Sequence, residues 1–147
     1  MKLVQINDEA IKEQFEQKGY VIPSYDREKI REKTAKEPAW VHFGTGNIFR
    51  AFPAAVLDKL LSDASYDKGV IAVEGFDYDI IEKAYKPFDD LSLLVTLKSD
   101  GNIEKRVIGS VTESLTADTS READVARLKE IFVAPSLQMV SFTITEK

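Results

Sequence analysis

Short apolar runs and segments of helical periodicity alternate along this chain. The runs Trp40–Phe43, Gly69–Glu74 and Leu137–Ile144 are continuous and rich in branched or aromatic residues, which is typical of buried strands in a parallel sheet. Between the first two runs a helix is predicted from about Asn47, because apolar side chains recur there at intervals of three and four: Phe49, Phe52, Val56, Leu60 and Leu61.

The same spacing places a polar set on the outer face of that helix, namely Asp58, Lys59, Ser62 and Asp63. Pro53 interrupts the pattern, since proline lacks the amide hydrogen that a helix interior needs. The helix is therefore expected either to kink at Pro53 or to restart there.

Residues 1–38 form a predicted helical lead-in. Asn7 or Asp8 caps a first helix in which Ile11 and Phe15 share a face, and Gly19 ends it. The charged stretch Asp26–Lys36 predicts one or two exposed helical turns whose side chains are solvated. Pro38 closes the lead-in.

The second half of the chain predicts a hairpin followed by a helix and a strand. A short helix is expected over Asp79–Lys86, and the strand-like runs Leu91–Leu97 and Ile103–Val111 flank an Asp-Gly turn within 99–102. Thr119 and Glu122 have the spacing of a capping box before a helix that Ala134-Pro135 ends.

This order of elements predicts the α/β class, with a Rossmann-like, mostly parallel sheet and one antiparallel β-hairpin. Residues 39–147 hold only one half, and a little more, of a doubly wound dinucleotide fold, which normally has two such halves. We therefore expect an incomplete dinucleotide-binding domain.

Composition narrows the classes of partner. The net charge of −5 makes nucleic acid and anionic membrane poor partners, since binding phosphates requires clustered Lys and Arg. With no cysteine and a single histidine, the chain has little with which to build a disulfide scaffold or a metal site. No signal peptide or membrane-length apolar run is seen, so the cytoplasm is the expected location.

One motif points to chemistry. Gly44-x-Gly46 lies between a predicted strand and a predicted helix, where a dinucleotide fingerprint has a tight turn and a close backbone approach to the pyrophosphate. Asn47 and Arg50 are positioned to contact the same anion, and Glu74 ends the next strand, where an acid binds the ribose hydroxyls.

Two departures weaken this fingerprint. Phe49 occupies the place of the third glycine, and Glu74 lies further from Gly44 than the roughly 20 residues of the general rule. The alternative is a simple glycine turn that links a strand to a helix.

A resemblance to a known family adds to the motif. The stretch WVHFGTGNIFRAFP (Trp40–Pro53) resembles the nucleotide-binding signature of the long-chain mannitol dehydrogenase and fructuronate reductase family. VIPSYDREKI (Val21–Ile30), the hairpin segment LSLLVTL with SDGNIEKRVIGSVTESL, and SLQMVSFTITEK resemble further segments of that family in order and spacing.

The resemblance implies an NAD- or NADP-dependent oxidoreductase that interconverts a sugar alcohol or aldonate with a ketose or keto-uronate. It implies a cofactor site made of Gly44, Thr45, Gly46, Asn47, Ile48, Arg50 and Glu74. In that family a lysine of a C-terminal helical domain acts as acid and base. That domain is not expected within this chain, so the polypeptide alone is predicted to be inactive and to hold no catalytic residue.

Further residues bear on specificity. An acid at Glu74, or at the nearby alternative Asp77, would repel a 2′-phosphate and favours NAD over NADP. Histidines usual in the family near Phe49 and Phe52 are replaced here, which favours the fructuronate (mannonate-forming) branch.

His42 is expected to be a hydrogen-bonded structural residue. The last residues of the chain follow or end a predicted strand, at the edge where open α/β sheets place ligands: Thr143, Thr145, Glu146 and Lys147.

Two rival functions remain. One is a stand-alone nucleotide-sensing or protein-interaction module, and the other is a small reductase of another family, although no Tyr-x-x-x-Lys pair is present to serve it.

Overall fold

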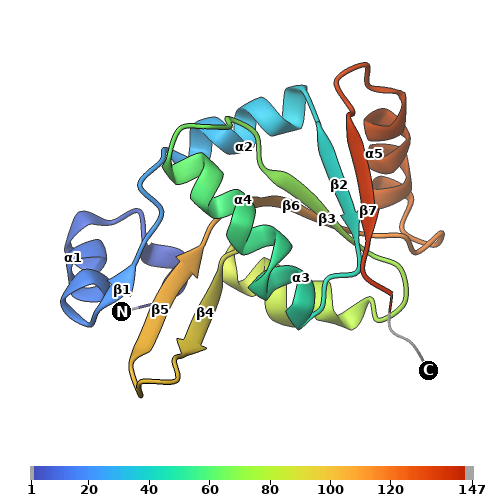
Figure 1. Ribbon diagram of the computed structural model, residues 1–147. Helices are drawn as coiled ribbons and strands as arrows, with labels where there is room; N and C mark the ends of the chain where they lie inside the picture. Colours follow the sequence, from blue (N-terminus) through green and yellow to red (C-terminus); the bar gives the residue numbers. More distant parts are fainter. Residues whose placement is uncertain (1, 145–147) are drawn as a thin grey trace.

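A parallel four-stranded sheet forms the centre of the chain, whose computed structural model describes residues 2–144 (Figure 1). The strands stand in the order β6-β3-β2-β7 and all neighbours pair in parallel. Their bounds are β2 (Trp40–Phe43), β3 (Val70–Glu74), β6 (Val111–Thr116) and β7 (Met139–Phe142). The α/β, Rossmann-like prediction is confirmed.

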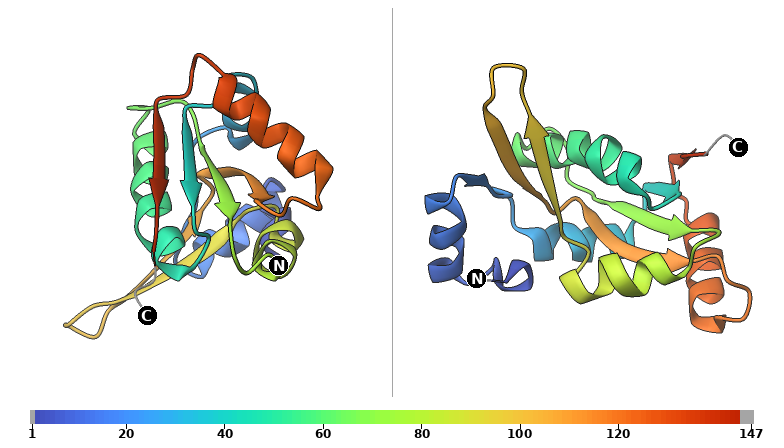
Figure 2. Two further views of the ribbon diagram at one scale, coloured as in Figure 1. Left: turned by 90° about the vertical axis from the view of Figure 1, so that its right-hand side faces the viewer. Right: turned by 90° about the horizontal axis from the view of Figure 1, so that it is seen from below.

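Helices cover both faces of this sheet. Figure 2 shows α4 (Pro53–Ser62) on one face and α5 (Glu122–Val133) on the other. The side chains of β3 alternate accordingly: Val70 and Ala72 pack in the cluster on the α4 side, and Ile71 and Val73 pack in the cluster that includes Ile131 of α5. All five residues of β3 are buried, as its continuous apolar run predicted.

The predicted hairpin belongs to a separate three-stranded sheet. Strands β4 (Ser92–Leu97) and β5 (Ile103–Ile108) pair antiparallel, and β1 (Tyr20–Val21) adds to β5 in parallel. The hairpin projects from the body of the molecule in both views of Figure 2.

The prediction of one strand over Ile103–Val111 was wrong. The chain leaves β5 at Ile108 and enters the main sheet as β6, parallel to β3. Gly109 lies at this crossing, where a Cβ would lie only 3.1 Å from Pro23 and from the Tyr25 hydroxyl. Local periodicity carries no sign of such a crossing.

The helix after the glycine turn restarts at Pro53, one of the two outcomes expected. Helix α3 (Asn47–Ala51) ends at Phe52, and Pro53 is the first residue of α4. Phe49 and Leu61 are buried as predicted, but the restart changes the phase of the helix, so the predicted faces were wrong in part. Asp58 is fully buried, with Ala54, Ala55, Leu57 and Leu61, whereas Phe52, Val56 and Leu60 are exposed.

The lead-in is largely as predicted for its first helix and different for its second. Asp8 caps α1 (Glu9–Gln17) by accepting hydrogen bonds from the amides of Ala10 and Ile11. Helix α2 (Arg27–Lys36) is not merely a solvated face, because Arg27 is 5% exposed. Its guanidinium donates to Asp89 Oδ2 at 2.6 Å and to the carbonyl of Gly109 at 3.2 Å.

Two smaller predictions also changed. Helix α5 begins at Glu122 with Arg121 as N-cap, so Thr119 lies outside it and the capping box does not form. Instead Asp124 accepts hydrogen bonds from the amide and hydroxyl of Thr116. The helix expected over Asp79–Lys86 is a π-helical turn, η2 (Ile81–Tyr85), followed by a 3-10 turn, η3 (Lys86–Phe88). A further 3-10 turn, η1 (Leu3–Gln5), lies near the start of the chain.

Within residues 2–144, no helix is both long enough and apolar enough to cross a membrane.

Candidate functional site

The Gly44-Thr45-Gly46 turn lies at the carboxyl ends of the parallel strands. It leaves β2 and continues the ladder for one bond, since the amide of Gly44 donates to the carbonyl of Val73 at 2.9 Å. Strand β2 has β3 on one side and β7 on the other, so the chain order reverses at this point. In open α/β sheets the ligand crevice forms outside the carboxyl ends of the strands at such a switch.

The two glycines of the turn have different constraints. Gly44 has φ +102°, and a Cβ there would approach the carbonyl oxygen of Thr143, in the chain after β7, to 2.8 Å. Gly46 has φ −72°, which any residue adopts, and nothing lies within 4 Å of a Cβ built on it. The first glycine is therefore required by the fold itself, whereas the second leaves open space beside the turn.

Thr45 is completely buried between the glycines and is joined to Glu74 at the end of β3. Its amide and its hydroxyl both donate to Glu74 Oε2, at 3.1 and 2.5 Å. Its carbonyl accepts a 2.7 Å hydrogen bond from the hydroxyl of Tyr85. The backbone of Thr45 is thus held on both sides.

The other carboxylate oxygen of Glu74 holds the loop after β3. Oε1 accepts from the amides of Phe76 at 3.0 Å and Asp77 at 3.3 Å. Burial by itself raises the pKa of Glu74, but the hydrogen bonds from Thr45, Phe76 and Asp77 outweigh it and lower the pKa below its ordinary value. Glu74 is therefore a carboxylate, although it is only 9% exposed.

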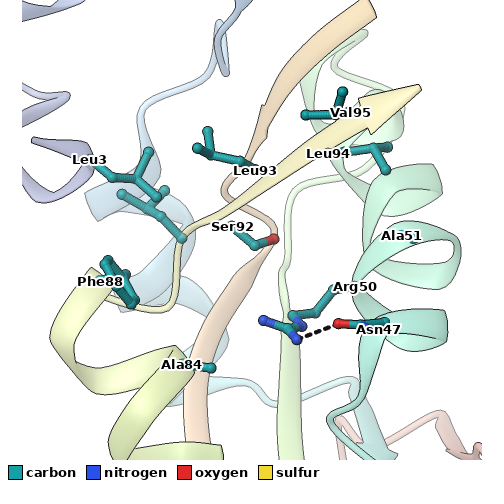
Figure 3. Close-up of a pocket in the computed structure, with 11 residues that line it drawn as sticks. Leu3, Asn47, Arg50, Ala51, Ala84, Phe88, Ser92, Leu93, Leu94 and Val95 are labelled. Atoms are coloured by element: carbon teal, nitrogen blue, oxygen red, sulfur yellow. Dashed lines mark hydrogen bonds between the residues drawn. The ribbon is translucent and has the colours of Figure 1, made fainter. Parts of the chain in front are cut away.

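Asn47 and Arg50 lie on α3 and contact each other. Arg50 donates to Asn47 Oδ1 at 2.6 Å, and its guanidinium carbon lies 5.7 Å from the centre of the Tyr85 ring. Both side chains line a hollow of about 400 Å³ between α3 and β4, which Figure 3 shows. Ile48, the third of the predicted helical contacts, is 72% exposed.

His42 has the structural role that was predicted for it. The ring is buried on β2, with Nδ1 2.8 Å from Ser141 Oγ and Nε2 3.2 Å from Thr143 Oγ1. It stacks on Phe49 with a centroid distance of 4.2 Å, and burial lowers its pKa. Phe49, in the place of the third glycine, is thus accommodated by a flat histidine ring.

Comparisons with known proteins agree with this geometry. No protein-family model matches the chain. The D-mannonate oxidoreductase of Thermotoga maritima is 49% identical over 146 residues, which are 98% of this chain and 27% of that protein. Mannitol 2-dehydrogenase of Pyrenophora tritici-repentis is 32% identical over 127 residues, 85% of this chain and 20% of that protein. The chain belongs to the mannitol dehydrogenase family.

Solved structures of this family share the fold. A D-sorbitol dehydrogenase in substrate-free form matches with a TM-score of 0.70 and 31% identity, over 87% of this chain and 25% of that one. The mannitol 2-dehydrogenase of Pseudomonas fluorescens, in a ternary complex with NAD and D-mannitol, matches with a TM-score of 0.69 and 26% identity, over 86% and 24%. The chain corresponds to the N-terminal part of such mannitol dehydrogenases and spans about a quarter of their length.

Some of the residues predicted from the family signature meet and others do not. Thr45 contacts Glu74 directly, and Asn47 contacts Arg50, whereas neither carboxylate oxygen of Glu74 bonds to the Asn47–Arg50 pair. Thr143 lies at the turn, where its hydroxyl donates to the carbonyl of Gly44 at 3.2 Å. Thr145, Glu146 and Lys147 lie outside the described residues.

Sequence reasoning missed two residues that support the site. Tyr85 comes from η2 and holds the carbonyl of Thr45, and Ser141 comes from β7 and accepts a hydrogen bond from the Trp40 ring at 2.7 Å. Alternation along the last strand offered a weak sign of Ser141, since a polar residue in an apolar run faces a polar partner. Nothing local marked Tyr85.

Proposed function

We propose that this chain is the cofactor-binding part of an NAD-dependent oxidoreductase that interconverts a sugar acid or polyol with the corresponding keto compound. The 49% identity to a D-mannonate oxidoreductase supports the mannonate-forming branch over mannitol itself. The NAD in the complex of the related mannitol 2-dehydrogenase supports the cofactor class. The nicotinamide, when bound, supplies the group that gives or takes the hydride.

The observation that carries this proposal is the contrast between the two glycines of the turn. Gly44 is packed against Thr143, while Gly46 faces space that nothing in the described chain fills. A dinucleotide needs such a place, where the pyrophosphate can approach backbone without a side chain in between. In this proposal Gly46, Asn47 and Ile48 offer their amides to the pyrophosphate, and Arg50 supplies a positive charge beside it.

An acidic side chain in the loop after β3 supports NAD over NADP. Asp77 is exposed three residues after Glu74, so a negative charge lies where the resemblance places the adenosine ribose. A 2′-phosphate brought to this edge of the sheet would meet like charge.

We further propose that residues 39–147 are the part of the chain that contributes to the cofactor site, with residues 1–38 as a lead-in that braces it. The relatives are about four times as long as the chain. In this proposal, catalysis requires the further residues of the family, and the 147-residue polypeptide alone is inactive.

Calorimetric titration of the chain with NADH and, separately, NADPH tests the proposal. We expect NADH to bind more tightly than NADPH and Gly46→Val to abolish binding of both. Gly46→Val is a suitable control because nothing within 4 Å obstructs a new Cβ and φ is negative, so the variant should fold. Its free energy of unfolding should fall by about 1 kcal/mol, since Gly46 is the N-cap of α3 and valine is disfavoured there.

Binding of NADH that survives Gly46→Val unchanged would contradict the assignment of the turn. Reduction of fructuronate by the chain alone would contradict the prediction of inactivity. NADH binding without turnover, abolished by Gly46→Val, is the expected result.

A further inference from the structure

We infer that Glu74 is a positioning residue that fixes the Gly44-Thr45-Gly46 turn from within, and that it does not itself receive a ribose hydroxyl. This inference rests on the proposed function and changes the role that the family signature suggested for Glu74. It leaves Asp77 as the exposed acid in the loop after β3.

The hydrogen-bonding capacity of the carboxylate decides the point. An ionised carboxylate has two oxygens and about four acceptor positions. All four are used within the chain: the amide and hydroxyl of Thr45 occupy Oε2, and the amides of Phe76 and Asp77 occupy Oε1. A ribose hydroxyl bound by Glu74 would therefore have to displace a bond that holds one of the two loops.

Burial supports the same conclusion. Glu74 is 9% exposed and its partner Thr45 is completely buried, so the carboxylate points into the protein beneath the turn. Asp77 donates its own amide to Glu74 while its side chain is exposed. The side chain of Asp77 is thus exposed to solvent, whereas that of Glu74 is hydrogen-bonded within the protein.

The effect of Glu74 on the turn follows from these contacts. Thr45 is held at its amide and hydroxyl by Glu74 and at its carbonyl by Tyr85, and the carbonyl of Gly44 is held by Thr143. Together these bonds turn the side chain of Thr45 inward and leave Gly46 facing open space. Glu74 also ties this turn to the loop after β3, so the two loops that border the carboxyl ends of β2 and β3 are fixed relative to each other.

Amide hydrogen exchange, measured by NMR on the chain without cofactor, tests the positioning role directly. We expect Glu74→Ala to speed exchange at Thr45, Phe76 and Asp77 by about tenfold or more, while Ala72 in the middle of β3 keeps its protection. Asp77→Ala is the matched control, and it should leave exchange at Thr45 unchanged. Unchanged exchange at Thr45 in Glu74→Ala would overturn the inference.

Conservative replacement and pH give a second readout. Glu74→Gln keeps the length of the side chain but only one acceptor oxygen, so protection should be retained on one of the two loops and lost on the other. In the parent, the protection factor at Thr45, which corrects the exchange rate for its intrinsic pH dependence, should fall as the pH falls through the lowered pKa of Glu74, and Glu74→Gln should remove that change. A Glu74→Gln chain with full protection at both loops would contradict the inference.

Nucleotide titration separates positioning from contact. Glu74→Ala should weaken NADH and NADPH by a similar factor, of about tenfold, because it loosens a turn that both use. Asp77→Ala should instead raise the affinity for NADPH relative to NADH. A change in the NADH-to-NADPH ratio on Glu74→Ala but not on Asp77→Ala would overturn the inference. If the parent binds neither nucleotide, the proposed function of the chain fails, and the exchange result alone then decides the role of Glu74.

Discussion

Two buried acids, Glu74 at the turn and Asp58 on α4, differ in how completely their carboxylate oxygens are hydrogen-bonded. Glu74 is 9% exposed and accepts four hydrogen bonds. Asp58 is fully buried, and only Oδ1 accepts hydrogen bonds, from the Tyr25 hydroxyl at 2.6 Å and from the Gly109 amide at 2.9 Å. Oδ2 has no hydrogen-bond partner among the described residues, and Arg106 Nη1 lies 3.7 Å from it.

The pKa values of the two acids move in opposite directions for this reason. Burial raises the pKa of Asp58, and the bonds from Tyr25 and Gly109 with the charge of Arg106 do not compensate. Burial also acts on Glu74, but its four donors lower its pKa overall. Asp58 is buried more deeply than Glu74 and has fewer donors, and both differences favour the neutral form of Asp58 and the charged form of Glu74.

The two acids also join different parts of the molecule. Glu74 fixes two loops at the carboxyl ends of the strands, beside the open space at Gly46. Asp58 joins the lead-in, α4 and the crossing from β5 to β6. One acid shapes the candidate site, and the other holds the architecture around it.

The largest expected effect in this comparison comes from Glu74→Gln. The amide turns two acceptor positions into donors that face the N–H groups of one loop, so we expect unfolding free energy at pH 7 to fall by about 3 kcal/mol. Urea unfolding followed by circular dichroism measures it.

The pH dependence of this difference has a definite sign. Because the folded pKa of Glu74 is lowered from 4.5, its stabilisation is complete above that value and is lost as the pH falls through it toward the folded pKa. The parent and Glu74→Gln should therefore converge in acid. A difference that grows as the pH falls would contradict the hydrogen-bonding account.

A smaller effect is expected from Tyr25→Phe. The substitution removes one of the two donors to Asp58 Oδ1 and leaves the ring in place, so it should cost about 1.5 kcal/mol at pH 7. The cost should shrink in the background of Asp58→Asn, because the lost bond is then to a neutral acceptor. A double-mutant cycle from thermal or urea unfolding measures this coupling, and strict additivity would contradict a direct Tyr25–Asp58 bond.

The features that could be predicted from the sequence are those that depend on local signals. Continuous apolar runs predicted β2, β3 and β7, and an Asp-Gly turn predicted the β4–β5 hairpin, because these signals are local. The burial of Asp58 and Arg27 was not predictable from spacing. A restart at Pro53 changed the face of α4, and the partners of Arg27 come from residues more than sixty positions away.

In the candidate site, the local turn could be predicted from the sequence, but the long-range hydrogen-bond partners could not. The position of Gly44-Thr45-Gly46 between strand and helix was predicted, since the motif carries its own local geometry. Which acceptor each donor would find, including the four donors to Glu74, was not. Its four bonds depend on how the loops after β2 and β3 approach each other, which no spacing along the chain records.

The smallest and sharpest prediction is Asp58→Asn. Because the folded pKa of Asp58 is raised from 3.8, the stability that it contributes is complete below that value and is lost as the pH rises through the folded pKa. Asparagine keeps an oxygen for Tyr25 and Gly109 and replaces the uncompensated Oδ2 by a neutral group, so the variant should equal or exceed the parent by about 1 kcal/mol at pH 7. This difference should disappear in acid, as that of Glu74→Gln does, but at pH 7 the two differences have opposite signs. Urea midpoints at pH 4 and pH 7 measure both signs, and a loss of stability at pH 7 in both variants would mean that Arg106 favours the charge of Asp58 more strongly than the 3.7 Å separation indicates.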